Sequence, residues 1–270
     1  MSTLLCVHAH PDDEAIATGG VMMKAKADGH RVVLVTATRG EEGEIHNVDE
    51  ASTRPRLGEV RTEELKRACE ILGVDRLEFL GYRDSGMAGV PSNDNPDCFA
   101  RAGLHEAARR LIEILKQERP EVVVTYTPDG TYGHPDHIRA HQVAVAALEI
   151  LEREEGWRPA KFYWQAVPRG LMRQFMERMA QEEEQGPDQM AMRIIGVNDD
   201  DITTWVDVKP FVQRKREAFA AHVTQNDPNS PFATMAGQIF ETAFGTETFT
   251  LFKGNPGGEP ETDLFAGLPN

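Results

Sequence analysis

The sequence predicts an α/β protein in which helices cover both faces of a mostly parallel sheet, followed by a smaller and less regular C-terminal part. Apolar runs of strand length alternate with segments of helical periodicity along residues 1–155. Their spacing is that of right-handed βαβ crossovers, which place helices on the faces of a parallel sheet. The stretch "RVVLVTAT" (31–38) contains a continuous apolar run, "VVLV", as expected of a strand buried on both faces. These observations indicate a Rossmann-like core.

Four βα units make up this core. We expect strands at 3–9, 31–38, 76–82 and 121–127, with helices at 12–28, 58–72, around 104–115 and from Pro135 onward. Gly29 and Gly73 stand where the first two helices should end, because glycine is favoured just beyond a helix C-terminus. Pro120 separates the third helix from the fourth strand. Long loops are expected at 39–57 and 83–101.

Residues 156–270 form the less regular part, an extension that we expect to complete the fold and a ligand cleft. A strand is expected near 161–166, helices near 168–184 and 208–224, and a last strand at 248–253. The tail from residue 254 is rich in Gly and Pro, which predicts mobility. Leu264, Phe265 and Leu268 are nevertheless apolar and could dock onto the core.

Charge and cysteine content narrow the classes of function. The chain has 44 Asp and Glu against 29 Lys and Arg, and its net charge of −15 disfavours nucleic acid and membrane phosphates as partners. Cys6, Cys69 and Cys98 are too few and too scattered for a disulfide framework. Without a signal-peptide pattern or an apolar run of membrane-spanning length, we expect a soluble cytoplasmic protein. The sequence leaves open whether it forms a homo-oligomer.

Charged residues are concentrated where the first strand meets the first helix. The stretch "VHAHPDDE" (7–14) places His8 and His10 at the carboxyl end of the strand and three acidic residues in the following turn. Ligands of parallel sheets bind beyond this end of the strands. His10 and Asp13 are three positions apart, so their side chains can meet across a helical turn, whereas Asp12 must point elsewhere.

A second cluster, "YGHPDH" (132–137), follows the fourth strand in the equivalent place, and its His134 and His137 are also three positions apart. Two strand-end clusters facing one crevice could assemble a mononuclear metal site. Imidazole with carboxylate suits Zn²⁺ best, although Fe²⁺ can occupy similar ligands. Such a centre can lower the pKa of a bound water to about 7, a spare carboxylate can act as general base, and a spare histidine can stabilise an oxyanion or protonate a leaving amine. These groups together indicate hydrolysis of an amide.

Other interpretations of the same residues exist. Acidic residues are favoured in a first helical turn by the helix dipole, and a single HxxH is common. A phosphoesterase using Mg²⁺ is disfavoured because that ion prefers oxygen ligands, and a non-catalytic sugar-binding module is a further alternative. His8 shares a strand face with His10, so spacing alone does not separate the two. His141 is expected on a helix face rather than at the metal.

The motifs "AHPDDE" (9–14) and "HPDH" (134–137) resemble those of the LmbE or PIG-L family of zinc-dependent N-deacetylases, which remove acyl groups from N-acetylglucosaminyl substrates. The resemblance covers at least residues 1–150. It implies that zinc is bound by His10, Asp13 and His137 and that Asp12 is the general base. It also implies that His134 stabilises the oxyanion and protonates the amine, and that Asp136 orients His134 through its carboxylate. Tyr132 would contact the substrate or the oxyanion. Arg61 and Asp84 match positions that hold sugar hydroxyls, although Arg61 could otherwise be a surface charge of an amphipathic helix.

Three further stretches resemble members of that family. "YRDSGMAG" (82–89) resembles the mycothiol-pathway deacetylases, and "GEEGEI" (40–45) and "DCFAR" (97–101) resemble both these enzymes and the mycothiol S-conjugate amidases. They imply a small-molecule glucosaminide as the substrate. The segment "AIATGG" (15–20) carries small or apolar side chains where such amidases carry a lysine, which favours a plain deacetylase over an amidase. The stretch "RKREAFAAHVTQ" (214–225) also resembles the family and suggests a structural role for His222, and Glu14 is expected to support the helix start or a hydrogen bond at the site.

Overall fold

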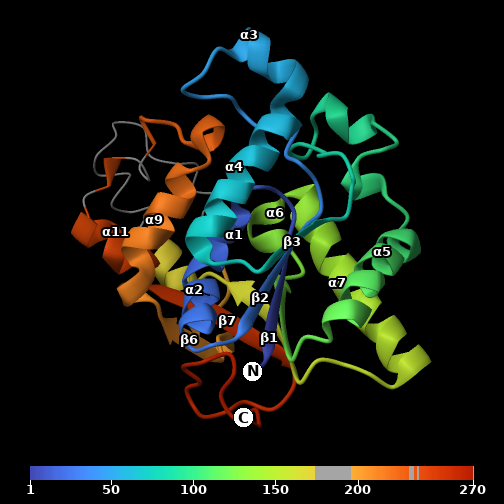
Figure 1. Ribbon diagram of the computed structural model, residues 1–270, viewed down its shortest axis with the longest axis vertical. Coiled ribbons are helices and arrows are strands. Elements are labelled where there is room, and N and C mark those ends of the chain that lie inside the picture. The colour runs from blue at the N-terminus through green and yellow to red at the C-terminus, as the bar shows by residue number, and fades with distance from the viewer. Residues whose placement is uncertain (174–195, 231–233, 236, 270) are drawn as a thin grey trace.

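A seven-stranded sheet of order β3-β2-β1-β4-β5-β7-β6 runs through the computed structural model, which describes residues 1–173, 196–230, 234–235 and 237–269 (Figure 1). The strands are β1 (Thr3–His8), β2 (Arg31–Thr36), β3 (Arg76–Phe79), β4 (Val122–Tyr126), β5 (Lys161–Ala166), β6 (Thr204–Asp207) and β7 (Thr246–Lys253). Strands β1 to β5 are parallel, and β7 is antiparallel to both of its neighbours. The predicted α/β fold with a mostly parallel sheet is confirmed.

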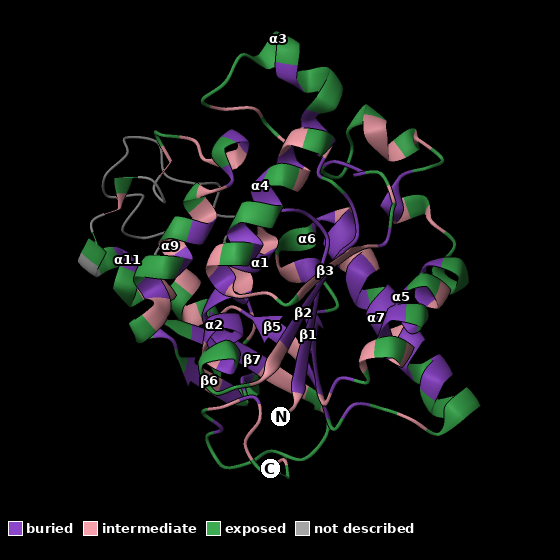
Figure 2. Ribbon diagram, viewed as in Figure 1, coloured by how far each residue is buried: buried purple, intermediate pink, exposed green. Residues whose placement is uncertain are grey.

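Helices cover both faces of this sheet. They are α1 (Asp13–Ala17), α2 (Gly19–Ala27), α3 (Glu50–Thr53), α4 (Leu57–Leu72), α5 (Leu104–Glu118), α6 (Gly130–Gly133), α7 (Pro135–Glu155), α9 (Val212–Ala220) and α11 (Gly237–Phe244). Leu5 and Val7 of β1 pack with α5 and α7, whereas Leu4 and Cys6 of the same strand pack with α2, α4 and α9. Alternating side chains of one strand thus enter two cores, which explains the unbroken apolar runs in the sequence. Figure 2 shows β1 and β2 largely in the colour of buried residues.

Several element predictions need correction. The helix expected at 12–28 is divided at Thr18 into α1 and α2, and α2 packs so closely on Val208 that a Cβ on Gly20 would lie 2.5 Å from the valine Cβ. The helix expected at 208–224 is the shorter α9, because 3₁₀ turns flank it on both sides. The short edge strand β6 and helix α11 were not predicted. Most of the helix expected at 168–184 lies outside the described residues.

The C-terminal tail packs against the sheet instead of remaining free. Glu261 is 1% exposed and accepts hydrogen bonds from Lys161 Nζ, from the Tyr163 hydroxyl at 2.6 Å and from Thr204 Oγ1 at 2.7 Å. Leu264 is buried in the core of the α2 face, as its apolar character allowed. The mobility expected from composition is therefore wrong for this part of the tail.

None of the helices in the described ranges combines the length and the hydropathy needed to cross a bilayer.

Candidate active site

The site lies beyond the carboxyl ends of β1 and β4, where the two predicted clusters meet. His10 and Asp13 follow β1, and His134 and His137 lie at the start of α7 after β4. The ring nitrogens of His10, His134 and His137 lie within 4.8 Å of one another, and all three residues are buried. These histidines therefore meet beyond the carboxyl ends of the parallel strands, where ligands of such sheets bind.

Asp13 joins the two clusters. Its Oδ1 is 3.3 Å from His137 Nε2, and its Oδ2 is 3.4 Å from His10 Nδ1. Its Oδ2 also accepts hydrogen bonds from the His10 backbone N–H at 2.8 Å and from the Tyr126 hydroxyl at 2.7 Å. Burial alone would raise the pKa of Asp13, but the imidazoles of His137 and His10 hold it well below its usual range. Asp13 is therefore an ionised carboxylate between two imidazoles.

His134 is fixed by its position at the N-terminus of α7. Its Nδ1 accepts a hydrogen bond from the Asp136 backbone N–H at 3.1 Å, as an N-cap side chain does, and Pro135 occupies the first helical position. Because Nδ1 is the acceptor, the neutral ring carries its proton on Nε2. Burial, followed by the charges of His10 and His137, lowers the pKa of His134 to about 4. The ring is thus a neutral donor at the site.

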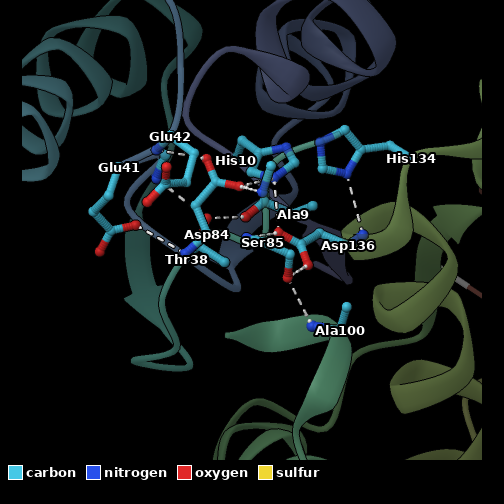
Figure 3. A network of polar contacts seen from close by, with 12 residues as sticks. Ala9, His10, Thr38, Glu41, Glu42, Asp84, Ser85, Ala100, His134 and Asp136 are labelled. Atoms are coloured by element: carbon cyan, nitrogen blue, oxygen red, sulfur yellow. Dashed lines mark hydrogen bonds and ion pairs between the residues drawn. The ribbon is translucent and has the colours of Figure 1, made fainter. Parts of the chain in front are cut away.

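The Asp136 carboxylate does not orient His134 as expected, because it is held by other groups. It accepts hydrogen bonds from both the backbone N–H (2.9 Å) and the hydroxyl of Ser85, and its Oδ2 lies 3.2 Å from His10 Nε2 (Figure 3). The imidazole of His134 is oriented by the Asp136 peptide group instead. Asp136 is fully buried and supports His10 and the loop that carries Ser85.

The carboxylate of Asp12 pairs with the guanidinium of Arg61. Arg61 is 3% exposed, and its guanidinium donates to Asp12 Oδ2 at 3.1 Å, to the Pro11 carbonyl at 2.5 Å and to the Gly40 carbonyl at 2.8 Å. Burial raises the pKa of Asp12 to about 6, although Arg61 opposes that rise. The alternative that Arg61 is a surface charge is excluded. Its guanidinium anchors Asp12 and the loop at Gly40.

Asp84 connects two loops next to His10. It is 3% exposed, accepts hydrogen bonds from the backbone N–H groups of Glu42 at 3.2 Å and Gly86 at 2.8 Å, and its Oδ1 lies 3.4 Å from His10 Nε2. Burial would raise its pKa, but His10 and the Gly86 N–H hold the pKa below its usual range. Figure 3 shows this carboxylate between the Glu42 loop and the His10 ring.

Tyr132 lies at the open side of the site. Tyr132 belongs to the short helix α6, in which the preceding residue, Thr131, adopts a φ of +71°. The Tyr132 residue is 46% exposed. The Tyr132 hydroxyl is 3.5 Å from His137 Nε2. The residue is therefore placed to meet a molecule that enters the site.

Sequence reasoning missed Tyr126 and Ser85. The Tyr126 hydroxyl contacts Asp13, accepts the Ala9 N–H at 2.8 Å and lies 3.2 Å from His8 Nδ1. Tyr126 is the last residue of β4, so the strand-end rule could have identified it. His8 Nε2 lies 2.8 Å from Thr18 Oγ1, and His141 contacts the Tyr126 carbonyl from α7, so neither residue belongs to the cluster of His10, His134 and His137.

A cavity of about 430 Å³ opens beside Asp12, Asp13, Tyr132 and His137. The extension supplies much of its wall, from the end of β5 and from α11 and β7, and α1 contributes Ile16 and Ala17. The remaining lining side chains include Gln165, Val167, Leu171, Met172, Phe244 and Thr248. A small molecule could therefore reach the histidine cluster through a largely apolar chamber.

The donor set fits a metal ion of the zinc type. Three imidazoles and the Asp13 carboxylate converge, and zinc is bound by such nitrogen and oxygen ligands. Hydrolytic zinc sites use three protein ligands and leave one coordination position open for water or substrate, so these four groups are enough for such a site.

Comparisons with known proteins place these features in a family. A family model described as PIG-L, GlcNAc-PI de-N-acetylase, matches residues 5–148. The chain is 44% identical to the 1D-myo-inositol 2-acetamido-2-deoxy-alpha-D-glucopyranoside deacetylase of Thermomonospora curvata, over 98% of this chain and 97% of the relative. It is 41% identical to the protein of that name from Thermobispora bispora, over 98% of each.

Among solved structures, the N,N'-diacetylchitobiose deacetylase of Pyrococcus horikoshii shares the fold. Its TM-score is 0.65 at 20% identity, and the match covers 93% of this chain and 84% of that one. The match to the family model and the identity to these relatives, together with the histidine and aspartate motifs, show that the chain belongs to the PIG-L family of de-N-acetylases.

Proposed function

We propose that this protein is a zinc-dependent amide hydrolase that removes the acetyl group from an N-acetylglucosaminyl inositol of the mycothiol pathway. The observation that carries the proposal is the meeting of His10, Asp13 and His137 at one edge of the sheet. Asp12 lies next to Asp13 in the chain, and its carboxylate pairs with Arg61. This arrangement separates residues suited to hold an ion from a carboxylate suited to move a proton. The names of the relatives support the identity of the substrate.

His10, Asp13 and His137 would hold the zinc ion, which supplies Lewis acidity toward the amide carbonyl and lowers the pKa of water. Asp12 takes the proton from the attacking water, because its carboxylate lines the cavity and its pKa is raised toward neutrality. Arg61 holds that carboxylate by a hydrogen bond. Fe²⁺ could occupy the same ligands, since the donor set does not distinguish the two ions.

His134 stabilises the oxyanion that develops on the amide carbonyl. Its neutral ring presents Nε2–H, and the fixed helix start holds the ring in place, so the donor needs no reorganisation during the reaction. The C–N bond then breaks as the nitrogen takes the proton that Asp12 has removed from water. The neutral His134 ring is too weak an acid to supply this proton, so the protonation of the amine that the motif implied for His134 passes to Asp12. Tyr132 is placed to contact the same oxyanion or the substrate from the open side.

We propose that the extension, residues 156–270, forms one wall of the substrate cleft and that residues 1–155 carry the catalytic groups. The cavity lining supports this division. Arg61 and Asp84 would act on the sugar mainly through the loops that they anchor, since both side chains are buried. A cytoplasmic location is consistent with the buried, unpaired thiols of Cys6, Cys69 and Cys98.

The alternative substrate is a mycothiol S-conjugate. Ile16 and Ala17 line the cavity, so the segment "AIATGG" presents apolar side chains where an amidase would need a cation. This observation favours the plain deacetylase.

The test is a screen of N-acylglucosaminides for release of primary amine, with metal content measured on the same sample. The N-acetylglucosaminyl inositol should be hydrolysed fastest, and a chelator should abolish the release until Zn²⁺ or Fe²⁺ is restored. Mycothiol S-conjugates serve as the competing substrates. A preference for S-conjugates would overturn the deacetylase assignment, and chelator-resistant release would overturn the metal mechanism.

A further inference from the structure

We propose that Glu14, supported by His222, is a positioning residue that holds the backbone of Asp12 in the conformation required for its role as general base. The inference rests on the proposed function, in which Asp12 moves the proton. It assigns a task to two buried residues that take no part in binding the ion. Both are 0% exposed and lie beneath the turn that joins β1 to α1.

The first observation is the backbone of Asp12 itself. Its φ is +110° and its ψ is −32°, a conformation that residues with a side chain rarely adopt. Strained backbone of this kind persists only where the surroundings over-determine it, and it is concentrated at functional sites. Something in the structure must therefore hold the Asp12 peptide against its own preference.

The second observation is how the polar backbone groups of this turn are satisfied. Asp13 accepts the His10 N–H, Arg61 donates to the Pro11 carbonyl, and the Asp12 carbonyl accepts from the N–H of Ala15 in α1. The Asp12 N–H donates to Glu14 Oε2 at 2.9 Å. Glu14 thus fixes the one peptide N–H whose direction sets the unusual φ of Asp12.

The third observation is that Glu14 is itself held in place. Its Oε1 lies 2.7 Å from Nε2 of His222, a residue 208 positions away in the chain. Burial alone would lower the pKa of His222, but the Glu14 carboxylate raises it above its usual value. The two side chains therefore form a buried hydrogen-bonded pair, and the short contact between them restricts where the Glu14 carboxylate can lie.

His222 is anchored in turn by α4. The residue stands at the end of α9, immediately before the 3₁₀ turn Val223–Gln225. Within this turn, Thr224 donates from its backbone N–H and its hydroxyl to the two carboxylate oxygens of Glu64, at 2.8 and 2.7 Å. Glu64 lies one helical turn after Arg61 on α4. One helix therefore holds Asp12 twice, directly through Arg61 and indirectly through His222 and Glu14.

The test combines kinetics with crystal structures of the metal-loaded protein. Glu14→Leu removes the acceptor of the Asp12 N–H, and Glu14→Gln keeps an acceptor oxygen in the same place. The matched control is Glu261→Gln, which alters another buried carboxylate, paired with Lys161 at the opposite end of β5. His222→Leu serves as the second variant where Glu14→Leu does not fold, since it leaves Glu14 without its partner.

We expect Glu14→Leu to lower kcat by about 10- to 100-fold, as loss of an outer hydrogen-bond partner does at metal sites, with KM and metal content unchanged. Glu14→Gln should recover most of that loss. His222→Leu should lower kcat in the same way but less, and Glu261→Gln should affect thermal stability alone. In crystals of Glu14→Leu or His222→Leu, Asp12 should leave the positive-φ region and its carboxylate should move from Arg61.

An Asp12 backbone that keeps its φ in these variants, or an unchanged kcat, would overturn the positioning role. A wild-type protein that hydrolyses none of the N-acylglucosaminides would instead overturn the proposed function. In that case the crystal structures of the variants still decide whether Glu14 and His222 hold Asp12.

Discussion

The Tyr126 hydroxyl donates a hydrogen bond to Asp13 Oδ2 at 2.7 Å while it accepts the backbone N–H of Ala9 at 2.8 Å. One buried phenol thus ties the last residue of β4 to the turn after β1. Because the bond restrains the carboxylate proposed to hold the ion, it also restrains the shape of the metal site.

Tyr126→Phe should therefore weaken metal binding. Loss of an outer hydrogen bond to a ligand lowers metal affinity by about 10- to 100-fold, and titration of the metal-free protein with Zn²⁺ measures this change. Tyr163→Phe is the control, since its hydroxyl bonds Glu261 far from the site. Equal zinc affinity in wild type and Tyr126→Phe would contradict the assigned role.

His137→Ala should lose the metal and with it the activity. His137 is 2% exposed and directs Nε2 at the Asp13 carboxylate, so its removal deletes one of three proposed ligands. His141→Ala is the matched control, because His141 lies one helical turn later and contacts the Tyr126 carbonyl. Metal analysis of both purified variants checks the prediction. A His137→Ala protein that retains a full equivalent of metal would exclude this residue as a ligand.

Glu261 should contribute to the pH dependence of stability. Burial would raise its pKa, but Lys161, Tyr163 and Thr204 donate to the carboxylate and lower the pKa below the ordinary value of 4.5. Such a group contributes stability that is complete above the unfolded-state pKa and is lost as the pH falls through the folded-state pKa. Between about pH 6 and pH 3, the Tm of Glu261→Gln should consequently fall less than that of the wild type. Parallel Tm curves would show that Glu261 does not titrate in this way.

The order of elements and the location of the site could be predicted from the sequence because both depend on local patterns. Apolar runs of strand length gave β1 to β4, and the strand-end rule placed His10 and His137 together. The break at Thr18 was not predicted, and no local pattern reveals that Gly20, just after it, packs against Val208 far along the chain.

Contacts made by tertiary packing account for the rest. The Asp136 carboxylate could not be assigned from the motif "HPDH", because its partner Ser85 comes from the loop after β3. The sequence predicted a supporting role for Glu14 and a structural role for His222, but a single sequence does not show that residues 208 positions apart are in contact. Element β6 was missed because a four-residue edge strand carries too little periodicity to be recognised.

Asp12 is proposed to move the proton, whereas His10, Asp13 and His137 are proposed to hold the metal, and these two roles can be separated by experiment. Acetate and primary amine released from 1D-myo-inositol 2-acetamido-2-deoxy-alpha-D-glucopyranoside are measured for wild type and for Asp12→Ala, with metal content determined on the same samples. We expect equimolar products from wild type, and a loss of about 10²- to 10⁴-fold in kcat for Asp12→Ala at unchanged metal content. Near-normal turnover by Asp12→Ala would show that Asp12 is not the general base.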